Sequence, residues 1–142
     1  PPAVRSAPTR HALPKRNALL ELHHLWIGRM MSTTFFHDAD IALETIEEGR
    51  VTRKIKAHGG SMMAVEVMFT AGAIGYEHRH VHEQVCYCLS GEFEFTIEGQ
   101  KTRLKAGDSV YVPSSVLHGA LCISEGRLLD IFTPQREDFL KK

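Results

Sequence analysis

The chain has 142 residues, 43% of them hydrophobic and 24% charged, so it is long enough for one domain with a sizeable buried core. Lysine plus arginine and aspartate plus glutamate each number 17, which gives zero formal net charge and argues against nucleic acid as a partner. No segment reaches the roughly 18 consecutive apolar residues needed to span a membrane, so no membrane association is expected.

The first 31 residues are predicted to form an N-terminal extension. They contain a proline- and arginine-bearing start, PPAVRSAPTRHALPKR, followed by the amphipathic run ALLELHHLWIG, which could form one short helix or remain a tail. A signal or transit segment shows a basic start, an apolar centre and a small-residue cleavage site, and this stretch matches that pattern poorly. We therefore place the folded domain at residues 32–142.

The first part of this domain has the pattern of short β-strands. Residues 41–60 offer two or three short alternating runs that are separated by glycines. Residues 62–72, MMAVEVMFTAG, form a nearly continuous apolar run closed by a glycine, which fits a buried strand.

The second part of the domain continues the same pattern. Residues 92–113 alternate between apolar and polar side chains across two turns, which predicts three further strands. Residues 126–134 form a last strand, and residues 135–142 form a short closing helix or tail. No helix-length periodicity appears after residue 50, and many short strands at regular spacing predict an all-β sandwich or barrel.

The three cysteines do not suggest a disulfide framework, because their number is odd and Cys86 and Cys88 are close enough to share one strand. We therefore expect a reducing, cytoplasmic setting. If strand alternation continues from Gln84, both of these thiols face inward, and we expect them and Cys122 to act as small apolar fillers of the core.

Three histidines stand at alternate positions in the stretch EHRHVHEQ. On a strand, His78 and His80 would point to the same side and could share a divalent ion, since neutral imidazole suits zinc, nickel, copper, manganese and iron. Taken alone, such a pair is more often explained by exposed loop histidines, so further ligands are required. Gln84 and His118 are the candidates.

Two stretches of the chain resemble the two sequence motifs of the cupin family. The first is GAIGYEHRHVHEQVCYCLSG, residues 72–91, and the second is GDSVYVPSSVLHGALC, residues 107–122. The matching positions are Gly72, His78, His80, Gly91, Gly107, Pro113 and His118. Gln84 stands where most cupins have glutamate, Ser115 replaces a glycine, and Cys122 replaces an asparagine. The resemblance implies a small single-domain, jelly-roll-like β-barrel, often a homodimer, with one divalent metal ion inside and with His82 at the mouth of the barrel.

A narrower resemblance, to KdgF-type pectin-degradation cupins, is carried by HEQVCYCLSGEFEFTIEG and the ending DIFTPQREDFL. It implies that the ligands of the ion are His78, His80, Gln84 and His118. Imidazole and amide oxygen admit several ions, so nickel, zinc, manganese and iron all stay open. The resemblance further implies that Asp130 transfers protons and that Phe132 packs against the substrate. The implied activity converts small unsaturated uronate sugars to open-chain keto forms.

The neutral amide of Gln84 bears on the choice among activities. Three imidazoles and one amide leave the charge of a divalent ion nearly unneutralised, which makes the ion a stronger Lewis acid and attracts carboxylate or hydroxyl-bearing ligands. Such a set supports high oxidation states less well. The sequence therefore favours an enzyme acting on a small carboxylate or sugar, and it leaves open a non-catalytic metal-dependent binding cupin and an Fe(II) dioxygenase.

Overall fold

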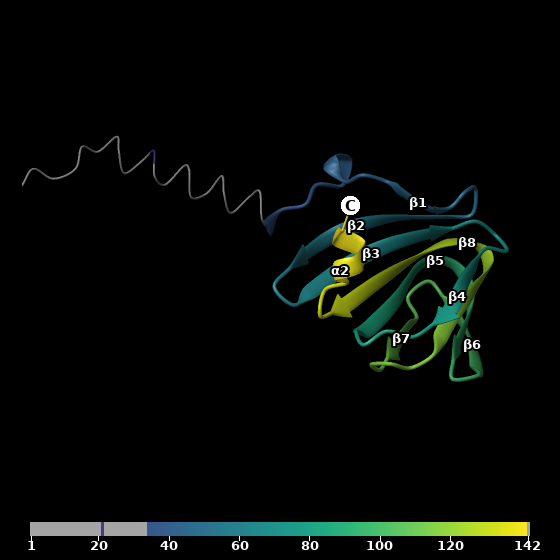
Figure 1. Ribbon diagram of the computed structural model, residues 1–142. Helices are drawn as coiled ribbons and strands as arrows, with labels where there is room; N and C mark the ends of the chain where they lie inside the picture. Colours follow the sequence, from purple (N-terminus) through teal and green to yellow (C-terminus); the bar gives the residue numbers. More distant parts are fainter. Residues whose placement is uncertain (1–20, 22–33, 142) are drawn as a thin grey trace, which may run out of the picture. The chain divides into compact units, whose positions relative to one another are not determined.

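The computed structural model describes Glu21 and residues 34–141, so the predicted N-terminal extension lies, apart from that one glutamate, outside the described residues. Residues 34–141 form an all-β domain whose strands make one eight-stranded sheet (Figure 1). The elements in chain order are the 3-10 turn η1 (Asp38–Asp40), β1 (Glu44–Glu47), β2 (Val51–Gly59), β3 (Met62–Phe69), β4 (Ile74–His78), β5 (Glu83–Ile97), β6 (Gln100–Lys105), β7 (Ser109–Val112), β8 (His118–Thr133) and helix α2 (Glu137–Leu140).

The sheet is antiparallel and folds over on itself. Its strand order is β1-β2-β3-β8-β5-β6, while β4 pairs with β8 and β7 pairs with β5. The two long strands β5 and β8, of 15 and 16 residues, take part in both layers, as Figure 1 shows. The expected jelly-roll-like barrel is confirmed.

Both long strands bend in the middle, where two glycines pass each other. The backbone register of β5 and β8 shifts between Cys88 and Phe93. Gly91 adopts a φ of +78°, and a Cβ atom on it would lie 2.5 Å from the carbonyl oxygen of Glu125. A Cβ atom on Gly126 would likewise collide with the backbone of Ser90. Only glycine on both strands permits this approach, which lets each strand change layers.

Two clusters of buried side chains form the core. The larger one fills the interior and includes the three cysteines, all of them free, as expected for core fillers. The smaller one lies beneath α2 and contains Met63, Val65 and Phe132, with Phe139 and Leu140 of the helix packed against it. The closing helix is therefore attached through apolar contacts.

The predicted strands are present, but two of them are longer than expected, because β5 begins already at Glu83 and not near residue 92. The last strand, expected at residues 126–134, is the second half of β8, which begins already at His118. Residues 118–125 alternate less regularly between apolar and polar side chains, so the sequence pattern does not indicate the first half of this strand. Within residues 34–141, no helix is both long and apolar enough to cross a membrane.

Candidate metal centre

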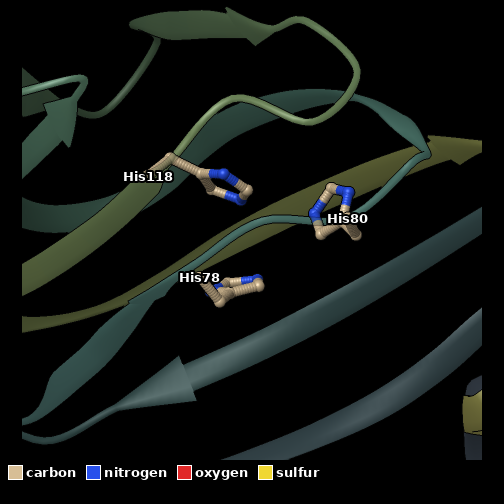
Figure 2. Close-up of side chains that lie close together, drawn as sticks. All are labelled: His78, His80 and His118. Atoms are coloured by element: carbon tan, nitrogen blue, oxygen red, sulfur yellow. The ribbon is translucent and has the colours of Figure 1, made fainter.

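Three imidazoles from two strand ends and one loop surround a common space (Figure 2). His78 ends β4 and is paired in register with His118, which begins β8. His80 follows β4 in the loop, so the expectation that it shares a strand with His78 is wrong. One nitrogen from each of the three rings lies within 4.8 Å of the others, which is the arrangement that a metal ion requires.

The backbone fixes the tautomer of all three rings. Nδ1 of His78 lies 2.8 Å from the carbonyl oxygen of Tyr76, and Nδ1 of His118 lies 2.8 Å from that of Val116. Nδ1 of His80 makes the same contact, at 3.0 Å, with the carbonyl oxygen of residue 82. A carbonyl oxygen only accepts, so each Nδ1 carries the proton and each Nε2 offers a lone pair. Metal-binding histidines are usually oriented in this way, by a hydrogen bond from the ring nitrogen that does not bind the metal.

Gln84 presents its oxygen to the same space. Its Nε2 donates to Oδ1 of Asp130 at 2.9 Å, and because a carboxylate accepts this bond, the amide oxygen must point the other way. That oxygen lies 3.0 Å from Nε2 of His80. Gln84 is 5% exposed and stands opposite Phe132 on β8.

The three imidazoles and the Gln84 amide are suited to binding a cation, and without a cation some of their acceptor atoms lack a partner. Nε2 of His118 is buried and has no hydrogen-bond partner among the described residues. Nε2 of His80 and Oε1 of Gln84 face each other with lone pairs, since the proton of His80 is on Nδ1. Burial lowers the pKa of His80, and it lowers that of His118 to about 4, so both rings are neutral. A divalent ion would satisfy all of these acceptors at once.

Asp130 lies directly behind Gln84. It is paired in register with Cys86 on β5 and Val65 on β3, which places it on the inner face. Loss of water raises the pKa of Asp130 to about 6, and hydrogen bonds from Cys86 and Gln84 partly oppose this shift. The carboxyl group can therefore hold or release a proton near neutral pH.

A cavity of about 430 Å³ opens beside these groups. His78, Gln84 and His118 contribute to its wall, together with the two residues that the sequence assigns to chemistry, Asp130 and Phe132. Its lining also includes side chains for which the sequence predicts no role, among them Arg53, Phe139 and Arg136.

Arg136 was missed because it follows the last strand and precedes a one-turn helix, where no periodicity marks a site. The signal that could have found it was the REDF sequence at the end of the chain. Its guanidinium carbon lies 5.2 Å from the ring centre of Phe132, and its charge helps to lower the pKa of His80.

Two other motif residues have structural explanations. His82 does not join the three-histidine group, and its ring contacts those of His80 and Phe132. Ser115 has a φ of +64°, a conformation that glycine adopts most easily, and its N–H donates to the carbonyl oxygen of His80 at 2.7 Å. Ser115 therefore holds the loop that carries a candidate ligand.

A folded-over antiparallel sheet that brings three histidines together defines the cupin class. The sequence profile of the cupin domain matches residues 65–132. A crystal structure of an RmlC-like cupin from Shewanella frigidimarina has a TM-score of 0.71 and is 42% identical, covering 74% of this chain and 94% of that one.

Other similar proteins identify the family within the cupin class. The pectin degradation protein KdgF of Dickeya dadantii is 40% identical over 108 residues, which are 75% of this chain and 97% of that protein. The structure of KdgF from Halomonas sp. has a TM-score of 0.71 at 38% identity, covering 75% of this chain and 99% of that one. The chain belongs to the KdgF family of cupins.

Proposed function

We propose that the protein is a metal-dependent enzyme that converts small unsaturated uronate-like sugars to their open-chain keto forms. The observation that carries the proposal is the convergence, on one cavity, of a neutral ligand set and a carboxyl group with a raised pKa. The similarity to proteins named for pectin degradation supports the same substrate class.

The cavity wall suits a sugar acid. Arg136 offers a cationic guanidinium group for the substrate carboxylate, since arginine matches the planar geometry of a carboxylate. Phe132, which is 3% exposed, offers a flat apolar surface for the sugar ring. Apolar side chains of β2, β3 and β8 form much of the remaining wall, which limits the water around the substrate.

The reaction requires a proton at carbon and a broken ring bond. The hydroxyl at the anomeric carbon loses its proton, the bond from that carbon to the ring oxygen breaks, and a C=O group forms there. The ring oxygen then becomes the ketone oxygen as a proton adds to the far carbon of the former double bond, so no atoms are gained or lost. We assign the transfer of this proton to Asp130, a role that typically contributes about 10² to 10⁴-fold in rate.

When bound, a divalent ion at His78, His80, Gln84 and His118 would polarise substrate oxygens as a Lewis acid. Imidazole and amide oxygen admit nickel, zinc, manganese or iron. The ligands add no negative charge of their own, which favours binding of an anionic substrate. This property supports the sugar acid over the oxygen-activating alternative.

The test is the loss of the enol-ether absorbance when unsaturated monouronate is added to the metal-loaded protein. Asp130→Asn should slow this loss by at least about tenfold with unchanged metal content, because the carboxyl proton is removed and the shape is kept. Asp40→Asn, at an exposed position of η1, is the control and should match the wild type.

The outcome separates the competing activities. Absence of turnover by the metal-loaded wild type would reject the enzyme, and tight uronate binding without turnover would favour a binding cupin. Oxygen uptake that disappears in His118→Ala would favour a dioxygenase.

A further inference from the structure

Two arginines contact the same aromatic ring at the edge of the cavity. The guanidinium carbon of Arg53 lies 3.9 Å from the ring centre of Phe139, and that of Arg136 lies 4.2 Å from it. Both arginines line the cavity, with side chains that are 17% and 13% exposed. Partly desolvated cation–π contacts of this kind are stronger than exposed ones.

The two arginines differ in how firmly the chain holds them. Arg53 lies within β2, between Glu44 on β1 and Val67 on β3. Its Nε and Nη2 both donate to Oε2 of Glu44, at 3.2 and 3.0 Å. Arg53 is therefore fixed by the sheet on both sides.

Arg136, in contrast, moves with helix α2. It immediately precedes the helix, and its Nε and Nη2 donate to both carboxylate oxygens of Asp138 in the helix, at 3.1 and 3.0 Å. A helix of four residues is not stable alone, so the place of α2 depends on its tertiary contacts. Phe139 contacts Phe132, at 5.9 Å between ring centres, and Arg53, and it packs together with Leu140 on the smaller core cluster.

We propose that Arg53 is a positioning residue, which through Phe139 holds α2 against the sheet and thereby fixes Arg136 at the place where the substrate carboxylate binds. This rests on the function proposed above. Sugar acids are the substrates whose binding depends on this arrangement. If Arg136 is displaced, binding of the anionic substrate weakens, while the ion and Asp130 stay in place.

The anchoring is tested without substrate, by hydrogen–deuterium exchange of the amides of residues 137–141 in the full chain. Arg53→Met and Phe139→Leu should each speed this exchange by about fivefold or more, because α2 opens more often. Lys54→Met removes the same charge from the neighbouring position of β2, where the lysine pairs with Asp38, and should leave the exchange unchanged. Unchanged exchange in both test variants would overturn the anchoring.

Kinetics then separate positioning from direct contact. Arg53→Met should raise KM for unsaturated monouronate by about tenfold and change kcat by less than about threefold. In an Arg136→Met background the same change should alter KM by less than about twofold, because Arg53 acts through Arg136. Additive effects would show that Arg53 contacts the substrate itself and would overturn the proposal. Arg53→Lys, which keeps a cation on Phe139, should restore part of the loss.

If the wild type shows no turnover, the proposed function fails, and the exchange experiment still decides whether Arg53 anchors α2. Calorimetry with galacturonate, a saturated uronate, then replaces KM in the double-variant comparison. Retained galacturonate affinity in Arg53→Met, despite faster exchange, would overturn the link from α2 to anion binding.

Discussion

The orientation of one amide decides the chemistry of the ligand set. Gln84 could present either its oxygen or its nitrogen to His80, and the hydrogen bond from its Nε2 to Asp130 selects the oxygen. The carboxyl group assigned to proton transfer thus also holds a candidate ligand in place. A carboxylate at position 84 would lack the N–H that this bond requires.

Gln84→Glu should therefore keep the metal ion and lose activity. Two carboxyl groups would replace the present donor–acceptor pair and repel each other or share a proton, which alters the proton available on Asp130. We expect at least about a tenfold fall in uronate turnover. Metal analysis and the absorbance assay measure the two effects, and Gln100→Glu on β6 is the control. Full activity in Gln84→Glu would contradict this account.

Ser115 carries a cost that glycine would avoid. A residue with a side chain in the left-handed region is strained by about 1–2 kcal/mol, whereas glycine loses about 0.5–1 kcal/mol through its more flexible unfolded chain. Ser115→Gly should thus unfold at an equal or slightly higher temperature. Ser115→Val, with a branched side chain at a φ of +64°, should lower the free energy of unfolding by about 1–2 kcal/mol. An equal decrease in the free energy of unfolding in both variants would contradict the proposed backbone strain at Ser115.

At the scale of elements, β5 and β8 connect the core to the site. The first half of β8, from His118, pairs with β4 and the second half of β5, and its second half pairs with β3 and the first half of β5. Because both strands change layers at their glycines, the start of β8 and the region of Asp130 line the same cavity. The crossing of Gly91 and Gly126 therefore positions the site from a distance.

Gly126→Ala should disrupt this crossing. The added methyl group would meet backbone atoms, which cannot turn away as a flexible side chain can, so we expect a loss of about 2 kcal/mol or more in the free energy of unfolding. Gly59→Ala is the matched control, because a Cβ atom there meets nothing within 4 Å. Urea titration measures both variants. Similar stability of the two variants would show that the strands separate at little cost.

On the outer face of the sheet, side chains of β5, β7 and β8 form an apolar patch. Val85 and Tyr111 are register partners on β5 and β7, and Leu129 and Ile131 lie opposite Tyr87 and Val85 on β8. Val85, Tyr87 and Tyr111 are 40%, 40% and 54% exposed in the single chain. Contiguous apolar surface of this kind favours association, which is consistent with the predicted homodimer.

We expect the double variant Val85→Lys and Tyr87→Lys to be a monomer by light scattering, because two like-charged lysines per subunit would oppose burial of the patch. The wild type and Met62→Lys, which changes an exposed apolar residue on β3 outside the patch, should both be dimers. A monomeric wild type would end the homodimer prediction, and a dimeric double variant would place the interface elsewhere.

Much of the fold follows from the sequence, since alternation along residues 92–113 predicts strands that the structure contains. The three grouped histidines and Gln84 could be named because their spacing matches known motifs. The continuous course of β8 could not be predicted, because its first half lacks regular alternation between apolar and polar side chains. The pairing of Arg53 with Arg136 could not be predicted either, since the two side chains come together at the ring of Phe139.

The cavity has two kinds of wall with separate origins in the chain. The candidate ion ligands in this wall come from β4, β5 and β8, whereas Arg53, Arg136 and Phe139 come from β2 and from α2 with the residue before it, near the two ends of the described domain. Exchange of these end segments between relatives could redirect ligand preference and leave the metal chemistry intact. Chimeric proteins joined after β3 and before α2 would thus be a practical route to new ligand selectivity.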